Sequence, residues 1–86
     1  MKLKDFLLLW TDNELIEVIF RSSSNGAYTA AELLKRGEYL DKTVSGAEVH
    51  VGKIDDFIAE DSLFRDDIFE VNKEKELPYI CLELCE

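Results

Sequence analysis

Residues 3–10 carry leucine, phenylalanine and tryptophan at the three- and four-residue steps of an amphipathic helix. Turn-forming residues at 11–13 end this pattern, and residues 14–20 then alternate, with the β-branched residues that are typical of a strand. Asn25-Gly26 is a favoured turn pair at the end of a serine-rich loop. The strand would place on one face Leu15, Glu17 and Ile19, and on the other Ile16, Val18 and Phe20.

The sequence Thr29-Ala-Ala-Glu32 has the form of a capping box and predicts the start of a second helix. In such a box the threonine hydroxyl and the glutamate carboxylate bond to amides that lack a partner within the helix. Gly37 follows Lys35 and Arg36 and is a good residue to end this helix.

The second half of the chain contains two further alternating segments, at residues 47–54 and 79–85. Pro78 rules out a helix that would run through the second segment. Between the two strands, residues 55–69 fit either a helix broken near residue 61 or a loop followed by a short strand. The last strand would present on one face Ile80, Leu82 and Leu84, and on the other Tyr79, Cys81, Glu83 and Cys85.

This order of elements predicts a single α+β domain over residues 1–86. We expect a three- to four-stranded antiparallel sheet with two or three short helices packed on one face. At this length roughly 60% of the surface of the unfolded chain would be buried, so the core is modest. No apolar run approaches the ~20 residues that cross a bilayer, and no signal-peptide pattern follows Met1. We therefore expect a cytoplasmic protein without a membrane partner.

The negative charge of the chain lies almost entirely in its second half. Residues 1–43 hold seven acidic and six basic side chains, whereas residues 44–86 hold twelve acidic and four basic ones. Within residues 55–70 the only basic residue is Arg65. The acidic side chains of this segment are Asp55, Asp56, Glu60, Asp61, Asp66, Asp67 and Glu70.

These seven carboxylates have two interpretations. They form a solvated face that keeps the protein in solution, or they form an interface that complements a basic groove such as a nucleic-acid-binding protein uses to hold phosphates. Tyr79 is a further candidate for partner binding, because aromatic residues dominate the energetics of interfaces. Under the second interpretation the partner is a basic protein surface, and direct binding of nucleic acid by this acidic chain is not expected.

Catalytic chemistry finds little support in the sequence. His50 is the only histidine, no Gly-x-Ser-x-Gly turn is present, and the four glycines are isolated rather than grouped in a phosphate-binding loop. We therefore expect a binding protein and not an enzyme. His50, Cys81 and Cys85 have ligand types suited to structural zinc, but Cys-x3-Cys on an extended strand separates the thiols by about 13 Å. That distance also argues against a disulfide.

The starting sequence Met-Lys-Leu-Lys-Asp-Phe-Leu, the Thr-Ala-Ala-Glu-Leu-Leu helix and the final Leu-Glu-Leu strand resemble small acidic accessory proteins of phages and mobile elements of Firmicutes. Some proteins of this size and charge are anti-CRISPR proteins, which occupy nucleic-acid-binding surfaces of Cas nucleases. The resemblance implies an inhibitor that acts on a Cas effector in the cytoplasm of a bacterial host. Two alternatives remain open: a phage accessory or structural protein that self-associates as a homodimer through its sheet, and a zinc-stabilised protein-binding domain.

Overall fold

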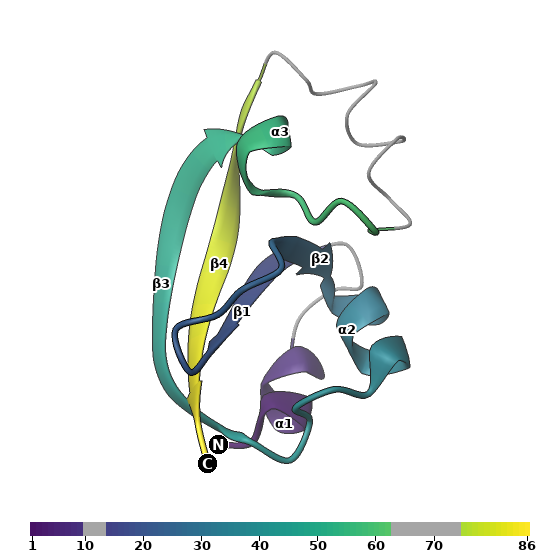
Figure 1. The fold of residues 1–86 in the computed structure, drawn as a ribbon, viewed down its shortest axis with the longest axis vertical. Helices are drawn as coiled ribbons and strands as arrows, with labels where there is room; N and C mark the ends of the chain where they lie inside the picture. The colour runs from purple at the N-terminus through teal and green to yellow at the C-terminus, as the bar shows by residue number, and fades with distance from the viewer. Residues whose placement is uncertain (10–13, 63–74) are drawn as a thin grey trace.

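The computed structural model of the chain contains one four-stranded sheet with the strand order β2-β1-β4-β3 (Figure 1). The structure describes residues 1–9, 14–62 and 75–86. β1 pairs with β2 and β3 pairs with β4 in antiparallel fashion, but the central strands β1 and β4 are parallel. The strands are β1 (Leu15–Phe20), β2 (Ala27–Thr29), β3 (Thr43–Lys53) and β4 (Glu76–Cys85).

The α+β class is confirmed, but the prediction of a purely antiparallel sheet is wrong. Two antiparallel pairs that are formed by consecutive strands lie side by side, and they join through the parallel contact of β1 and β4. Alternation of apolar residues fixes which face of a strand is buried, but it carries no information on the direction of the neighbouring strand.

The helices α1 (Leu3–Leu7) and α2 (Ala30–Arg36) cover one face of the sheet, which carries the larger core (Figure 1). Ile16 of β1 lies beside Ile80 of β4, and Val18 lies beside Leu82. Residues of both helices pack against these side chains. The predicted grouping of side chains on the two faces of each central strand is therefore confirmed, and the faces with Ile16 and Ile80 point toward this core.

The start and the end of α2 form as the sequence predicts. The Thr29 hydroxyl accepts a hydrogen bond from the Glu32 amide (3.2 Å), and the Glu32 carboxylate accepts one from the Thr29 amide (3.1 Å). Gly37 adopts the left-handed conformation, with φ of 75°, and its amide bonds to the Leu33 carbonyl oxygen. A glycine adopts this conformation without the steric cost that a Cβ atom brings.

A third helix, α3 (Ile54–Phe57), lies on the opposite face of the sheet, which corrects the expectation that all helices share one face. Ile54 and Phe57 form a second, smaller core with Leu15 of β1. The Phe57 ring stacks on Tyr79 of β4, with the ring centroids 4.1 Å apart. Leu15 and Tyr79 lie on the strand faces opposite the main core, and α3 covers the end of the sheet where they lie.

After α3 the chain passes around the edge of the sheet beside β2. Ile58 forms a parallel bridge with Ala27, and the Ala59 amide donates a hydrogen bond to the Ala27 carbonyl oxygen (2.9 Å). Of the ambiguous segment 55–69, residues up to Phe57 are therefore helical, Ile58 is extended, and Glu60 and Asp61 lie in a turn. Residues 63–74 lie outside the described part. In the described part of the chain, no helix is long and apolar enough to cross a membrane.

Candidate functional site

The face of the sheet opposite α1 and α2 is covered by α3 at one end only, and its remaining surface is acidic. The strand register brings three glutamates to this surface, one each from β1, β3 and β4. Two exposed aspartates of α3 continue the negative charge at the covered end. We call this surface the acidic face; its carboxylates are those of Glu17, Glu48, Asp55, Asp56 and Glu83.

Cys81 lies at the centre of the acidic face, between Glu17 on β1 and Glu48 on β3. Its thiol donates a hydrogen bond to Glu17 Oε1 (3.4 Å), and the Ser24 hydroxyl donates one to Glu17 Oε2 (2.9 Å). Burial, the bond to Glu17 and the charges of both glutamates raise the pKa of the Cys81 thiol to about 11. Cys81 is therefore a neutral thiol at physiological pH, and it helps to hold one carboxylate in place.

Glu48 is oriented by His50, two residues further along β3. The Glu48 carboxylate lies 3.0 Å from His50 Nε2, and the imidazole in turn packs 5.8 Å from the Tyr79 ring. Burial is the main cause that raises the pKa of Tyr79, and the charge of Asp56 adds to it. Among the described strand residues on this face, His50 is the one side chain that can become positively charged.

The carboxylates of the acidic face carry like charges that repel one another. Glu17 and Glu48 lie on the two neighbours of β4, so their Cα atoms are about 10 Å apart. At this distance two charges repel by about 0.4 kcal/mol in water and by about 1.7 kcal/mol at the effective dielectric of a protein surface. Beside Cys81 the surface is hollowed into a shallow groove, which is lined by Ile19, Gly46, Ala47, Glu48, Cys81 and Glu83.

The predicted acidic segment does not form one continuous surface in the described residues. Asp55 and Asp56 lie on α3 next to Tyr79 and belong to the acidic face. Glu60 and Asp61 lie on the other side of β2, where with Ser24, Asn25 and Tyr28 they line an open depression. Tyr79 is half-buried beneath α3. The remaining predicted residues, Asp66, Asp67 and Glu70, lie outside the described residues.

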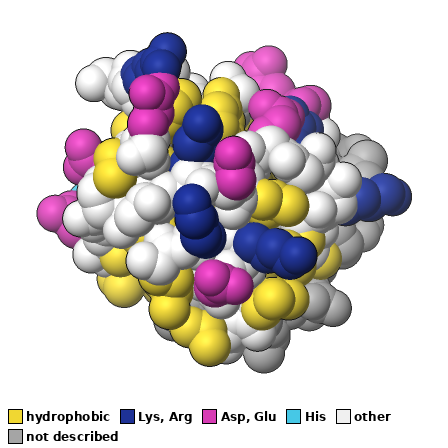
Figure 2. All heavy atoms as spheres, turned by 90° about the horizontal axis from the view of Figure 1, so that it is seen from below, with side chains coloured by type: hydrophobic (Ala, Val, Ile, Leu, Met, Phe, Trp, Pro, Cys, Tyr) yellow, Lys and Arg dark blue, Asp and Glu magenta, His cyan; other side chains and the backbone are white. Residues whose placement is uncertain are grey.

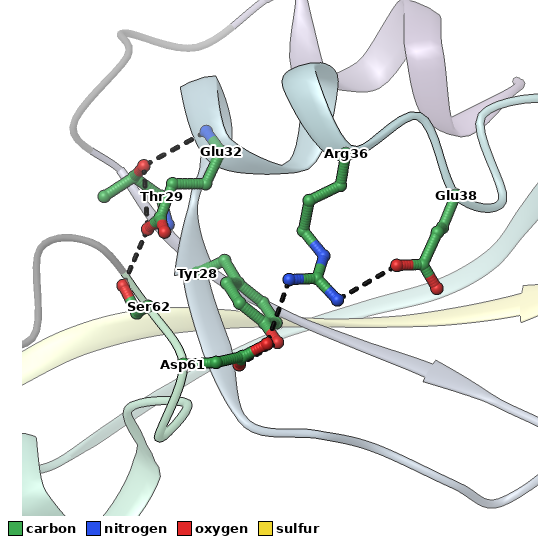
Figure 3. Close-up of polar contacts among 7 residues, drawn as sticks. All are labelled: Tyr28, Thr29, Glu32, Arg36, Glu38, Asp61 and Ser62. Carbon is green, nitrogen blue, oxygen red and sulfur yellow. Dashed lines mark hydrogen bonds and ion pairs between the residues drawn. The ribbon is translucent and has the colours of Figure 1, made fainter.

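Asp61 has a structural role, because its carboxylate accepts hydrogen bonds from two neighbours (Figure 3). The Tyr28 hydroxyl donates to Oδ1 (2.5 Å) and Arg36 Nη1 to Oδ2 (3.1 Å), and both lower the pKa of Asp61. The Arg36 guanidinium also lies over the Tyr28 ring, 4.5 Å from its centroid, and bonds to Glu38 (3.0 Å). Burial and the bond to Asp61 raise the pKa of Tyr28 to about 12.

Ser62 extends this attachment to the buried start of α2. Its hydroxyl donates a hydrogen bond to Glu32 Oε1 (2.7 Å), the oxygen that also accepts from Thr29 in the capping box (Figure 3). Asp61 and Ser62 therefore fix the chain that follows α3 onto β2 and α2. Their polar groups therefore contribute to the stability of the fold.

The end of the molecule that carries both termini has a different pattern of charge. Seen from this end, Lys and Arg side chains lie among Asp and Glu side chains and hydrophobic groups (Figure 2). The Lys2 ammonium bonds to the Asp41 carbonyl oxygen (2.8 Å), and Arg21 forms an ion pair with Glu86. Side chains of both charges lie side by side at this end, in contrast to the acidic face.

No protein-family model, curated protein or solved structure matches this chain. The site must therefore be interpreted from its own chemistry. His50 and Cys81 share the acidic face, while Cys85 lies at the far end of β4. Within residues 1–9, 14–62 and 75–86, no group of three or more potential ligands is arranged to hold a metal ion. The alternative of a structural zinc site stays untested.

The three glutamates of the acidic face were missed as functional candidates, although the sequence contained a signal for them. Alternation in the first and last strands already grouped Glu17 with Leu15 and Ile19, and Glu83 with Tyr79 and Cys81. The pairing of β1 with β4 then makes these two faces one surface. Their proximity depends on a parallel contact that alternation alone does not predict.

Proposed function

We propose that this chain is a non-catalytic protein-binding domain whose acidic face docks onto a basic surface of a partner protein. The observation that carries this proposal is the grouping of Glu17, Glu48 and Glu83 on three adjacent strands, with Asp55 and Asp56 at one end. A basic partner would remove the repulsion among these carboxylates, so charges that repel one another in the free chain would strengthen the complex.

The partner that suits this surface is a nucleic-acid-binding protein, because its Lys and Arg side chains are arranged to hold a row of phosphates. Carboxylates on adjacent strands, about 5 to 10 Å apart, can take the place of those phosphates. Long-range attraction between the two surfaces would also accelerate their encounter. By occupying the groove, the chain would inhibit the binding of nucleic acid by its partner.

The resemblance to anti-CRISPR proteins makes a Cas effector nuclease in the bacterial cytoplasm the specific partner that we propose. Arginine is the side chain expected on the partner, because its guanidinium pairs with carboxylates through two parallel hydrogen bonds. Glu17 and Glu48 suit such pairing, because neighbouring side chains already restrict their carboxylates. We include Asp66, Asp67 and Glu70 in the proposed interface as further negative charges.

A pull-down from bacterial lysate, at low and at high salt, tests this function. The variant Glu17→Gln/Glu48→Gln/Glu83→Gln removes three charges from the acidic face and keeps the side-chain shapes. A matched control, Asp41→Asn/Glu76→Gln/Glu86→Gln, removes three charges from exposed positions elsewhere. We expect the wild type and the control to retain basic nucleic-acid-binding proteins that high salt releases, and the first variant to lose them. Equal capture by both variants would refute the proposal.

A further inference from the structure

The two edges of the sheet differ in how they are covered. At the β2 edge, the chain around Ile58 adds a bridge to Ala27 and hides the strand. At the other edge, β3 is eleven residues long, and only its beginning is paired on the outer side. There Lys2 bridges Thr43, and the Val44 amide donates to the Met1 carbonyl oxygen (2.8 Å). From Gly46 to Lys53, no described residue pairs with the outer edge of β3.

Over residues 46–52, the uncovered part of β3 lacks the lysine, proline and bulge that often protect an edge strand. Natural edges carry lysine, proline or a bulge, which prevent pairing with another chain. In β3 the bulge lies at Ser45, before the open stretch, and residues 46–52 contain neither lysine nor proline. Val49 and Val51 are also 71% and 62% exposed, on the face that carries the main core further along the sheet.

The open stretch is complementary to itself. If two copies of β3 pair in antiparallel fashion with Val49 on the two-fold axis, Glu48 of each copy lies opposite His50 of the other. On the opposite face Val49 meets Val49, and Ala47 meets Val51, so the exposed apolar side chains cover one another. The pairing uses residues 46–52 of both copies, which is the stretch that Met1 to Leu3 leave open.

A neighbouring register loses this match. An axis on residue 48 would place glutamate opposite glutamate, and an axis on residue 50 would place histidine opposite histidine. Two carboxylates directly opposite each other repel, whereas a carboxylate opposite an imidazole can accept a hydrogen bond from it. The order Glu48-Val49-His50 thus selects one register among those that the open edge allows.

We propose that two copies of this chain form a symmetric dimer through residues 46–52 of β3, joined into one continuous eight-stranded sheet. A second copy of the chain fits this edge because one two-fold axis satisfies three conditions. Each Glu48 lies opposite a His50, the exposed apolar side chains cover one another, and the paired stretch has the length of the open edge. The dimer places two acidic faces side by side on one surface, so a partner would meet twice the number of carboxylates.

Sedimentation equilibrium at micromolar to submillimolar concentration tests the dimer and its register. His50→Glu places two carboxylates opposite each other at both symmetry-related positions, and we expect it to raise the dimer dissociation constant by about tenfold or more. Lys35→Gln lowers the net charge by the same amount at an exposed position of α2, and it should leave the dimer dissociation constant unchanged. The double variant Glu48→Lys/His50→Glu places opposite charges across the axis in place of the two facing carboxylates and should regain the dimer.

A second readout locates the axis directly. In a Cys81→Ser/Cys85→Ser background, Val49→Cys should form a covalent dimer under mild oxidation, because Cβ atoms opposite each other are about 5 Å apart. Glu76→Cys, at the first residue of β4 in the same background, should stay monomeric. A wild type that is monomeric at submillimolar concentration, an unchanged constant for His50→Glu, or no advantage of Val49→Cys over Glu76→Cys would overturn the proposal.

Discussion

Gly26→Ala should destabilise the fold far more than an alanine at a turn normally does. Gly26 has a φ of +97°, in the region that side chains with a Cβ atom rarely adopt. A Cβ atom there would lie 2.9 Å from both the Cα and the amide nitrogen of Ala59, and 3.0 Å from the Phe57 carbonyl oxygen. All three atoms belong to the backbone, so the chain that follows α3 along the edge of β2 would have to move.

The size of the effect follows from two contributions. A left-handed alanine costs about 1 to 2 kcal/mol. Displacement of the chain after α3 would weaken the hydrogen bond from the Ala59 amide to the Ala27 carbonyl oxygen, which contributes about 1 kcal/mol to stability. It would also disturb the packing of Phe57. The expected loss in the free energy of unfolding is about 2 to 4 kcal/mol.

Gly37→Ala is the matched control. Gly37 also has a positive φ, of 75°, but no atom lies within 4 Å of the added Cβ. This variant should lose only the cost of a left-handed alanine, about 1 to 2 kcal/mol. Equilibrium unfolding in urea measures both values, and an unchanged slope with denaturant shows that the states compared are the same. Equal losses for the two variants would refute the contact of Gly26 with the segment after α3.

Three further predictions concern titration and charge. Burial raises the pKa of Tyr28 to about 12, so the protonated phenol stabilises the folded state. This contribution should be constant below about pH 10 and be lost as the pH rises to about 12. The unfolding free energy should then fall by at most about 3 kcal/mol. Urea unfolding of Tyr28→Phe should lack this loss, and an identical pH profile would contradict it. With a pKa of about 11, Cys81 should react with a thiol reagent at pH 8 roughly a hundredfold more slowly than a thiol of ordinary pKa. The exposed Cys85 should therefore react first. Mass spectrometry of single-cysteine variants measures both rates, and comparable rates would refute the burial of Cys81. Glu83→Gln should raise the unfolding free energy by a few tenths of a kcal/mol at low salt, and a loss would show that this carboxylate stabilises the fold.

The elements that local chemistry determines were predictable from the sequence. The capping box at Thr29 and Glu32, the left-handed Gly37 and the inner face of β4 all form as expected, because each depends on residues within one turn or one strand. The β3 strand, however, begins at Thr43 rather than at Ala47. The bulge at Ser45 interrupts its alternation, so the pattern could not reveal the first residues.

The arrangement of the elements was less predictable, because it depends on contacts between distant parts of the chain. The parallel pairing of β1 and β4 and the position of α3 on the second face decide which carboxylates meet. Net charge drew attention to residues 55–70, yet Asp61 within this segment is bound by Tyr28 and Arg36. Glu17 comes from the half of the sequence that is almost neutral, and only the sheet places it in the acidic face.

An amide-resolved NMR titration with an oligoarginine peptide tests the acidic face as a binding surface most directly. The account predicts chemical-shift changes that are concentrated at Glu17, Glu48, Cys81 and Glu83, that weaken with salt, and that are lost in the Glu17→Gln/Glu48→Gln/Glu83→Gln variant. The control variant with its three substitutions elsewhere should titrate like the wild type. Shifts that spread evenly over all acidic residues, or that survive in the first variant, would contradict it.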